Sequence, residues 1–237
     1  MHIPDGFLPA PVCIAGYGAT GLLTWYSLKR IQHQRDPSAD IPKASLLAAA
    51  FFVASSISIP VPPMTVHLVL NGLLGAILGY YAFPAILVGL LFQSVFIGHG
   101  GLSTLGVDAA MMGLPALVAY HLFQLRSLLS QRLPLSWRVA IAGFVATAVG
   151  LGLSVLIFVG LIVTTVPPGL DAATERTAVA GLALAHLPLL VIEGLFTATV
   201  MVFLQRVKPE MIAAGQQFSR PNRSASERSA EASKHTV

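Results

Sequence analysis

The sequence predicts an all-α membrane protein, a polytopic bundle of about seven transmembrane helices, and three observations carry this prediction. Of the 237 residues, 55% are hydrophobic and 10% are charged, whereas soluble proteins contain about 25% charged residues. The mean hydropathy is +0.76. The apolar residues gather in runs near the length of about 20 residues that crosses a ~30 Å hydrocarbon core. Too few polar residues remain to cover a soluble core, so lipid surrounds most of the chain.

Seven apolar runs supply the expected spans in order. Their residue ranges are 8–28, 44–60, 64–81, 83–98, 108–125, 139–165 and 177–205. The third and fourth runs are short and meet near residues 82–84, which predicts a tight helical hairpin. Residues 1–206 then form one membrane-embedded domain. The remaining residues, 207–237, are rich in serine and poor in large apolar side chains, which predicts a disordered cytoplasmic tail.

The basic residues indicate the orientation of these spans. If seven spans alternate across the membrane, every lysine and arginine except Arg176 falls on one side. Cytoplasmic loops carry the excess of lysine and arginine, so we expect the N-terminus outside and the C-terminus in the cytoplasm. The formal charge of +4 is then a topology signal, and no nucleic-acid partner is expected.

Residues 1–6, Met-His-Ile-Pro-Asp-Gly, lack the positive start and the cleavage site of a signal peptide. We therefore expect the mature chain to begin at Met1. The Pro-Asp-Gly triplet favours a turn that returns the first residues toward the bundle. Because Cys13 is the single cysteine, a metal site must use histidine, carboxylate or main-chain donors.

Three nitrogens at this N-terminus can bind one metal ion together. They are the free amine of Met1, the main-chain nitrogen of His2 and the imidazole Nδ1 of His2, which close a five-membered and a six-membered chelate ring. Three nitrogens in a plane leave a fourth position that His67 can fill, and such a set suits Ni²⁺ or Cu²⁺, with imidazole also suiting cobalt. Any chain that begins Met-His has the first three donors, and a histidine hydrogen-bonded near a helix end is the alternative for His67.

Other polar residues lie where they can support such a site. Asn71 follows His67 by four residues, which places both on one helix face, and the glycines after it offer a smooth side for the N-terminal segment. The glycine-rich loop at residues 98–106 follows Gln93 and lacks the lysine of a phosphate-binding loop. It is either a flexible connection or a loop that enters the bundle and brings His99 beside the site without binding the metal.

Two further polar residues lie within the seventh expected span. His186 and Glu193 are seven residues apart, so they face the same way but are separated by ~10 Å along a helix and cannot bind one ion together. A buried carboxylate needs a partner. Their role stays open between a link to another helix, with Thr197 nearby, and a relay of protons or ions.

These motifs together resemble the CbiM/NikM family. The resemblance rests on residues 1–6, on residues 66–75 around His67, and on the sequence Gly-His-Gly-Gly-Leu at residues 98–102, and it extends over about residues 1–206. The family comprises the substrate-binding S components of energy-coupling factor (ECF) transporters for cobalt and nickel. The resemblance implies that the N-terminal segment inserts from outside and that Met1, His2 and His67 supply four nitrogen ligands.

The resemblance also assigns supporting and docking residues. His99, Asn71 and Asp108 would surround the ligands, and Asp108 stands where the family usually has asparagine, which adds a negative charge near the site. Ala50 and Ala54 resemble the small-residue pattern that docks on the coupling membrane subunit.

The implied function is a non-catalytic subunit that captures Co²⁺ or Ni²⁺ as substrate, with no permanently bound cofactor. Its partners would be membrane lipid, a coupling transmembrane subunit and two ATPase subunits in a bacterial or archaeal plasma membrane, with cobalamin biosynthesis as the use of cobalt. The metal preference and the need for a small two-helix accessory subunit stay open.

Two alternatives belong to other classes. A stand-alone metal/proton transporter would use Glu193 as proton carrier, but the sequence has no internal repeat. An intramembrane metal-dependent hydrolase would use Asp108, Glu193 or His186, but the sequence lacks the His-Glu-x-x-His motif.

Overall fold

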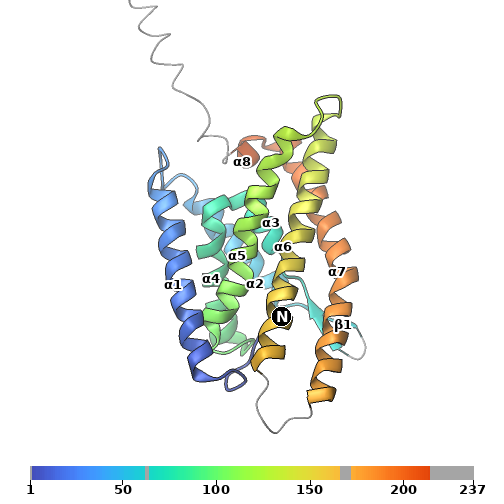
Figure 1. Cartoon of the computed structure of the whole chain (residues 1–237). Coiled ribbons are helices and arrows are strands. Elements are labelled where there is room, and N and C mark those ends of the chain that lie inside the picture. The colour runs from blue at the N-terminus through green and yellow to red at the C-terminus, as the bar shows by residue number, and fades with distance from the viewer. Residues whose placement is uncertain (1, 62–63, 166–171, 214–237) are drawn as a thin grey trace, which may run out of the picture.

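The computed structural model describes residues 2–61, 64–165 and 172–213. These residues form seven helices of eight residues or more, which lie side by side in a bundle (Figure 1) and confirm the predicted all-α membrane architecture. The helices are α1 (Ala10–Gln32), α2 (Ile41–Ser55), α3 (Asn71–Leu78), α4 (Ala82–Phe92), α5 (Leu105–Gln124), α6 (Leu135–Thr165) and α7 (Ala172–Val207). Four helical stretches in the described part are long and apolar enough to cross a membrane: Asn71–Ile97, Leu105–Leu128, Leu135–Thr165 and Ala183–Val207.

The expected second and third spans are wrong at their junction, where the chain forms a β-hairpin. Helix α2 ends at Ser55, and the strands β1 (Ser58–Val61) and β2 (Met64–His67) pair antiparallel with Ser58 opposite His67. The sequence has prolines at positions 60, 62 and 63, and proline cannot donate the main-chain hydrogen bond that a helix interior needs. His67 therefore lies at the end of a strand and not on a helix. Figure 1 shows this hairpin beside α7.

Helix α5 is the centre of the bundle and packs against α1, α3, α4 and α6, while every residue of α3 is buried. A Cβ at Gly75 would lie 2.1 Å from the carbonyl oxygen of Ala116 in α5, and one at Gly72 would lie 2.3 Å from Cα of Thr147 in α6. The expectation that these glycines receive the N-terminal segment is wrong, because they seat α3 against α5 and α6. The break between α3 and α4 occurs at Gly79, whose φ is +59°.

The beginning of the predicted tail is folded. The short helix α8 (Glu210–Ala213) buries Ile212, and the guanidinium of Arg126 donates to the carbonyl oxygen of Ile212 at 3.4 Å. Figure 1 shows α8 at the end of the bundle opposite the start of α1. The rest of the predicted tail, residues 214–237, lies outside the described residues.

Candidate metal centre

The N-terminal segment, residues 2–9, packs into the bundle ahead of α1. Ile3 is 1% exposed and lies in a small apolar cluster with Leu8, Cys13, Val107 and Ile162. The amide of Phe7 donates to the carbonyl oxygen of Pro4 at 3.3 Å, which closes the turn that the Pro-Asp-Gly triplet predicts. Met1, with the amine expected to bind metal, lies outside the described residues.

Three histidines from distant parts of the chain meet beside this segment. The ring centroids of His2 and His67 are 4.7 Å apart, those of His2 and His99 are 5.6 Å apart, and those of His67 and His99 are 6.1 Å apart. The shortest contact joins Nδ1 of His2 to Nε2 of His67 at 3.1 Å. The expectation from the sequence named Nδ1 of His2 and the imidazole of His67 as ligands, and the structure brings the Nε2 side of His67 to Nδ1 of His2.

The neighbours of His2 determine which of its nitrogens carries the proton. Gln93 is fully buried, and its Nε2 donates to the hydroxyl of Ser55 and to the carbonyl oxygen of Phe52, the latter at 3.4 Å. Its Oε1 therefore faces Nε2 of His2, at 2.9 Å. Because an amide oxygen only accepts, the proton of His2 lies on Nε2 and its Nδ1 is unprotonated. Burial lowers the pKa of the His2 imidazole well below its usual range, which favours this neutral form.

The same reasoning applies to His67. Its Nδ1 lies 3.3 Å from the carbonyl oxygen of Leu68, which can only accept, so a hydrogen bond between them places the proton on Nδ1 and leaves Nε2 unprotonated. With these tautomers, Nδ1 of His2 and Nε2 of His67 are both unprotonated and face each other across 3.1 Å. A metal ion between two such nitrogens could bind both of them.

The spacing of these nitrogens suits a shared metal ion. With metal–imidazole bonds of about 2.0–2.1 Å, two ligands at a right angle lie about 2.9 Å apart, close to the observed 3.1 Å. In the part of the chain that the structure describes, no group of three or more histidine, cysteine, aspartate or glutamate side chains is arranged to hold a metal.

Asp108 holds the main chain of the N-terminal segment. The amide of Ile3 donates to both carboxylate oxygens of Asp108, each at 3.2 Å, and Asp108 is 2% exposed. The hydroxyl of Thr104 donates to the carbonyl oxygen of Ile3. The main-chain N–H and the carbonyl oxygen of Ile3 are thus both hydrogen-bonded. The sequence motifs did not indicate the contact with Thr104.

Asp5 attaches the N-terminal segment to the loop at residues 98–106. The sequence predicted only a turn at Asp5. Its carboxylate accepts from the amide of Leu102 at 3.2 Å, the amide of Ser103 at 2.8 Å and the hydroxyl of Ser103 at 2.5 Å. Hydrogen bonds from Ser103 lower the pKa of Asp5. A Cβ at Gly101 would lie 2.1 Å from Oδ1 of Asp5, so this attachment requires glycine there.

The loop that carries His99 is partly buried and places His99 beside His2 and His67. The amide of His99 donates to the carbonyl oxygen of Gln93 at 3.2 Å. Gly101 and Thr104 are buried, while Gly98 and Leu102 are exposed. Nδ1 of His99 is buried and has no hydrogen-bond partner among the described residues.

Asn71 links helices. Its side-chain amide donates to the hydroxyl of Ser154 at 2.8 Å and to the carbonyl oxygen of Gly150 at 3.4 Å, both in α6. The expectation that Asn71 shares a helix face with His67 is wrong, because β2 ends at His67 and Leu70 takes the left-handed conformation before α3 begins.

Glu193 and His186 are both buried in α7, at 0% and 3% exposure. The carboxylate of Glu193 accepts from the amide of Val69 and from the amide of Leu70, the latter at 2.9 Å. Glu193 therefore joins α7 to the connection between β2 and α3 through main-chain groups.

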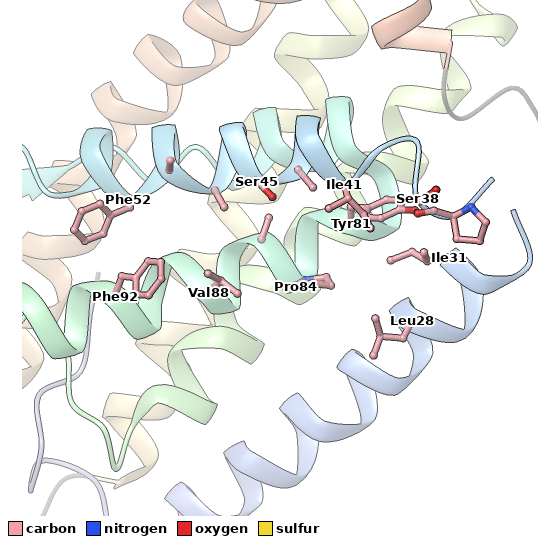
Figure 2. Close-up of a pocket in the computed structure, with 15 residues that line it drawn as sticks. Leu28, Ile31, Ser38, Ile41, Ser45, Phe52, Tyr81, Pro84, Val88 and Phe92 are labelled. Atoms are coloured by element: carbon pink, nitrogen blue, oxygen red, sulfur yellow. The ribbon is translucent and has the colours of Figure 1, made fainter.

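The predicted docking residues lie on α2, where Ala50 is exposed and Ala54 is partly buried. Neither lines the large groove of about 800 Å³ that runs between α2, α4 and the end of α1. Figure 2 shows Ile41 and Phe52 of α2 on one side of this groove and Val88 of α4 on the other.

Comparisons with known proteins show which sequences and folds this chain resembles. The sequence profile of the CbiM family, a cobalt uptake substrate-specific transmembrane region, matches residues 2–211. A Haemophilus influenzae protein named for metal transport is 32% identical over 92% of this chain and 100% of its own length. The cobalt transport protein CbiM of Sorangium cellulosum is 31% identical over 90% of this chain and 94% of its own length. The fused nickel transport protein NikMN of Rhodobacter capsulatus is 30% identical over 94% of this chain and 67% of its own length.

Two solved structures share the fold. A transition metal transporter has a TM-score of 0.68 at 23% identity, covering 87% of this chain and 93% of its own. A truncated transition metal transporter has a TM-score of 0.65 at 24% identity, covering 89% of this chain and 99% of its own.

Proposed function

Because the chain belongs to the CbiM family of cobalt-uptake transmembrane regions, we propose that it captures Co²⁺ or Ni²⁺ through four nitrogens and delivers the ion to an ATP-driven importer. The ligands are the Met1 amine, the main-chain nitrogen and Nδ1 of His2, and Nε2 of His67. The ion is the transported substrate. Members of this family are transporter components and not catalysts, so the chain is not an enzyme.

One observation carries the proposal. Nδ1 of His2 and Nε2 of His67 face each other across 3.1 Å, while the other nitrogen of each ring is directed at an oxygen that only accepts. These two acceptors favour the metal-binding tautomer of each ring before the ion arrives, which reduces the cost of binding. Asp108 and Asp5 hold the main chain that carries His2 and support the chelate.

The remaining parts of the proposal concern the setting. The chain is a membrane protein by its family and its apolar helices, and we place it in the plasma membrane with the metal centre outside and α8 in the cytoplasm, as the basic residues predict. A coupling membrane subunit that docks on the α2 face with Ala50 and Ala54, together with two ATPase subunits, supplies the energy for transport.

The N-terminal amine gives the sharpest test. Titration of Ni²⁺ into the purified protein, with a C-terminal tag, should give tight binding of one ion. One extra residue before Met1 should abolish tight binding, because the five-membered chelate ring loses its amine. Unchanged affinity in the extended protein would refute the amine ligand.

Replacement of His67 should weaken Ni²⁺ binding more than replacement of His99. His67→Ala removes a ligand and should weaken Ni²⁺ binding strongly, whereas His99→Ala should cost about 10–100-fold, as expected for a residue beside the ligands. A larger loss for His99→Ala in direct titration would mean that their roles are reversed.

Metal uptake by the purified protein alone in liposomes, without ATPases, would instead favour a secondary transporter.

A further inference from the structure

Glu193 has a buried position that metal capture, as described so far, does not use. It lies in α7, more than 120 residues from its partners in the chain, and none of its surface is exposed. Its two oxygens accept from two successive main-chain amides, those of Val69 and Leu70. A buried carboxylate is costly in a membrane bundle unless its hydrogen bonds are satisfied, so this pairing is specific.

The connection that Glu193 holds has an unusual backbone. Leu70 has φ 51° and ψ 9°, and it is the one non-glycine residue with positive φ in the part of the chain that the structure describes. A residue with a side chain adopts this left-handed conformation only when its surroundings impose it. The bonds from Glu193 to the amides of Val69 and Leu70 supply such a constraint.

The same bonds reach His67 through one peptide group. The peptide that joins Leu68 to Val69 donates its N–H to Glu193 and accepts the Nδ1 proton of His67 on its carbonyl oxygen, at 3.3 Å. A carboxylate that binds the N–H end of a peptide polarises its carbonyl end and strengthens the second bond. We infer that Glu193 is the positioning residue of His67, acting through the Leu68–Val69 peptide to aim Nε2 of His67 at the metal.

This chain of contacts resembles the carboxylate–histidine–metal arrangement of many metal sites, with a peptide group inserted between the carboxylate and the imidazole. A carboxylate suits the task better than an amide. It presents two acceptor oxygens to two donors, whereas the NH₂ group of a glutamine would face a main-chain N–H. Glu193→Gln should therefore release the Leu68–Val69 peptide with the smallest change in volume.

The inference rests on the proposed metal site, and a double-mutant cycle tests it. Ni²⁺ affinity is measured for the full chain, for Glu193→Gln, for His67→Ala and for the double variant. Glu193→Gln should weaken binding about 10–100-fold and shift the visible d–d absorption of the nickel complex toward that of His67→Ala. In the His67→Ala background the same change should have no further effect, because the ligand that it positions is gone.

Thr197→Val is the matched control, because Thr197 is also fully buried in α7, one turn beyond Glu193. It should leave nickel affinity and spectrum unchanged. If Glu193→Gln does not fold, Glu193→Asp keeps both oxygens, withdraws them by one methylene and carries the same cycle.

Two outcomes overturn the inference alone. One is a Glu193→Gln protein of lowered thermal stability that binds Ni²⁺ with the wild-type affinity and spectrum. The other is a loss of affinity that persists in full when His67 is alanine. Failure of the wild-type chain to bind Ni²⁺ would instead refute the proposed function, and with it the ligand that Glu193 positions.

Discussion

Replacement of Gln93 by leucine tests whether the proton of His2 is held on Nε2 for metal binding. Gln93 is fully buried, and its Oε1 lies 2.9 Å from Nε2 of His2. Leucine has a similar volume but no acceptor. In the metal complex Nδ1 is bound to the ion, so the Nε2 proton cannot move to the other nitrogen and stays buried without a partner.

The size of the effect follows from that unpaired donor. A buried donor without an acceptor costs about 1–3 kcal/mol, and each 1.4 kcal/mol changes an equilibrium tenfold. The metal-free protein avoids part of this cost, because His2 can then rotate or shift its proton to Nδ1. We therefore expect Gln93→Leu to weaken Ni²⁺ binding about 10–100-fold, the range typical for a lost partner of a metal ligand.

Isothermal titration of Ni²⁺ into protein with an unmodified N-terminus measures this loss, and the d–d spectrum reports the ligand set. The spectrum should stay that of the wild type, since Gln93→Leu removes no ligand. Ser55→Ala is the control: it removes a partner of the Gln93 amide but leaves Oε1 in place, so its effect should be smaller. Wild-type affinity for Gln93→Leu, or a greater loss for Ser55→Ala, would refute the tautomer argument.

Three further predictions concern the attachment of the N-terminal segment. Gly101→Ala places a Cβ 2.1 Å from Oδ1 of Asp5 and should weaken Ni²⁺ binding at least about tenfold. The control is Gly18→Ala, which has open space around the new Cβ and should leave the Ni²⁺ affinity measured by titration unchanged. Ile3→Ala empties a buried position, so it should destabilise the attachment by about 2–5 kcal/mol and speed hydrogen exchange in residues 2–9; unchanged exchange would contradict the burial of Ile3. Burial of the attached segment lowers the pKa of His2, so the attached segment binds fewer protons than the detached one. Attachment should therefore weaken as the pH falls below about 6.5. Equal exchange protection at pH 5.5 and 7.5, after correction for intrinsic rates, would argue against a neutral buried His2.

Several features of the fold followed from composition and hydropathy. Runs of apolar residues too long for a soluble core predict helices, because a chain in lipid must satisfy its main-chain hydrogen bonds within each segment. The seven helices of eight residues or more in the described part agree with this reasoning. The prolines before His67 carried a signal for the hairpin that apolar run length hides, since hydropathy does not register a missing N–H.

The donor chemistry of the candidate site was also readable from the sequence. The donor chemistry of the N-terminus leaves one position of a square-planar ion that His67 could fill, and the family resemblance implies the same pairing of His2 with His67. The support of that pair was not readable. Oε1 of Gln93 reaches His2 across 91 positions of the chain, and no local spacing predicts such a contact.

The sequence by itself determined that this chain is a membrane protein built of helices, because these properties depend on side-chain type and local order. Only the tertiary structure decided that Asp108 holds Ile3, that Asn71 serves α6 rather than His67 and that Glu193 reaches the peptide beside His67. Each of these depends on which buried donor finds an acceptor. Which donor pairs with which acceptor depends on the packing of segments distant in the chain, because the polar groups buried in the bundle need hydrogen-bond partners.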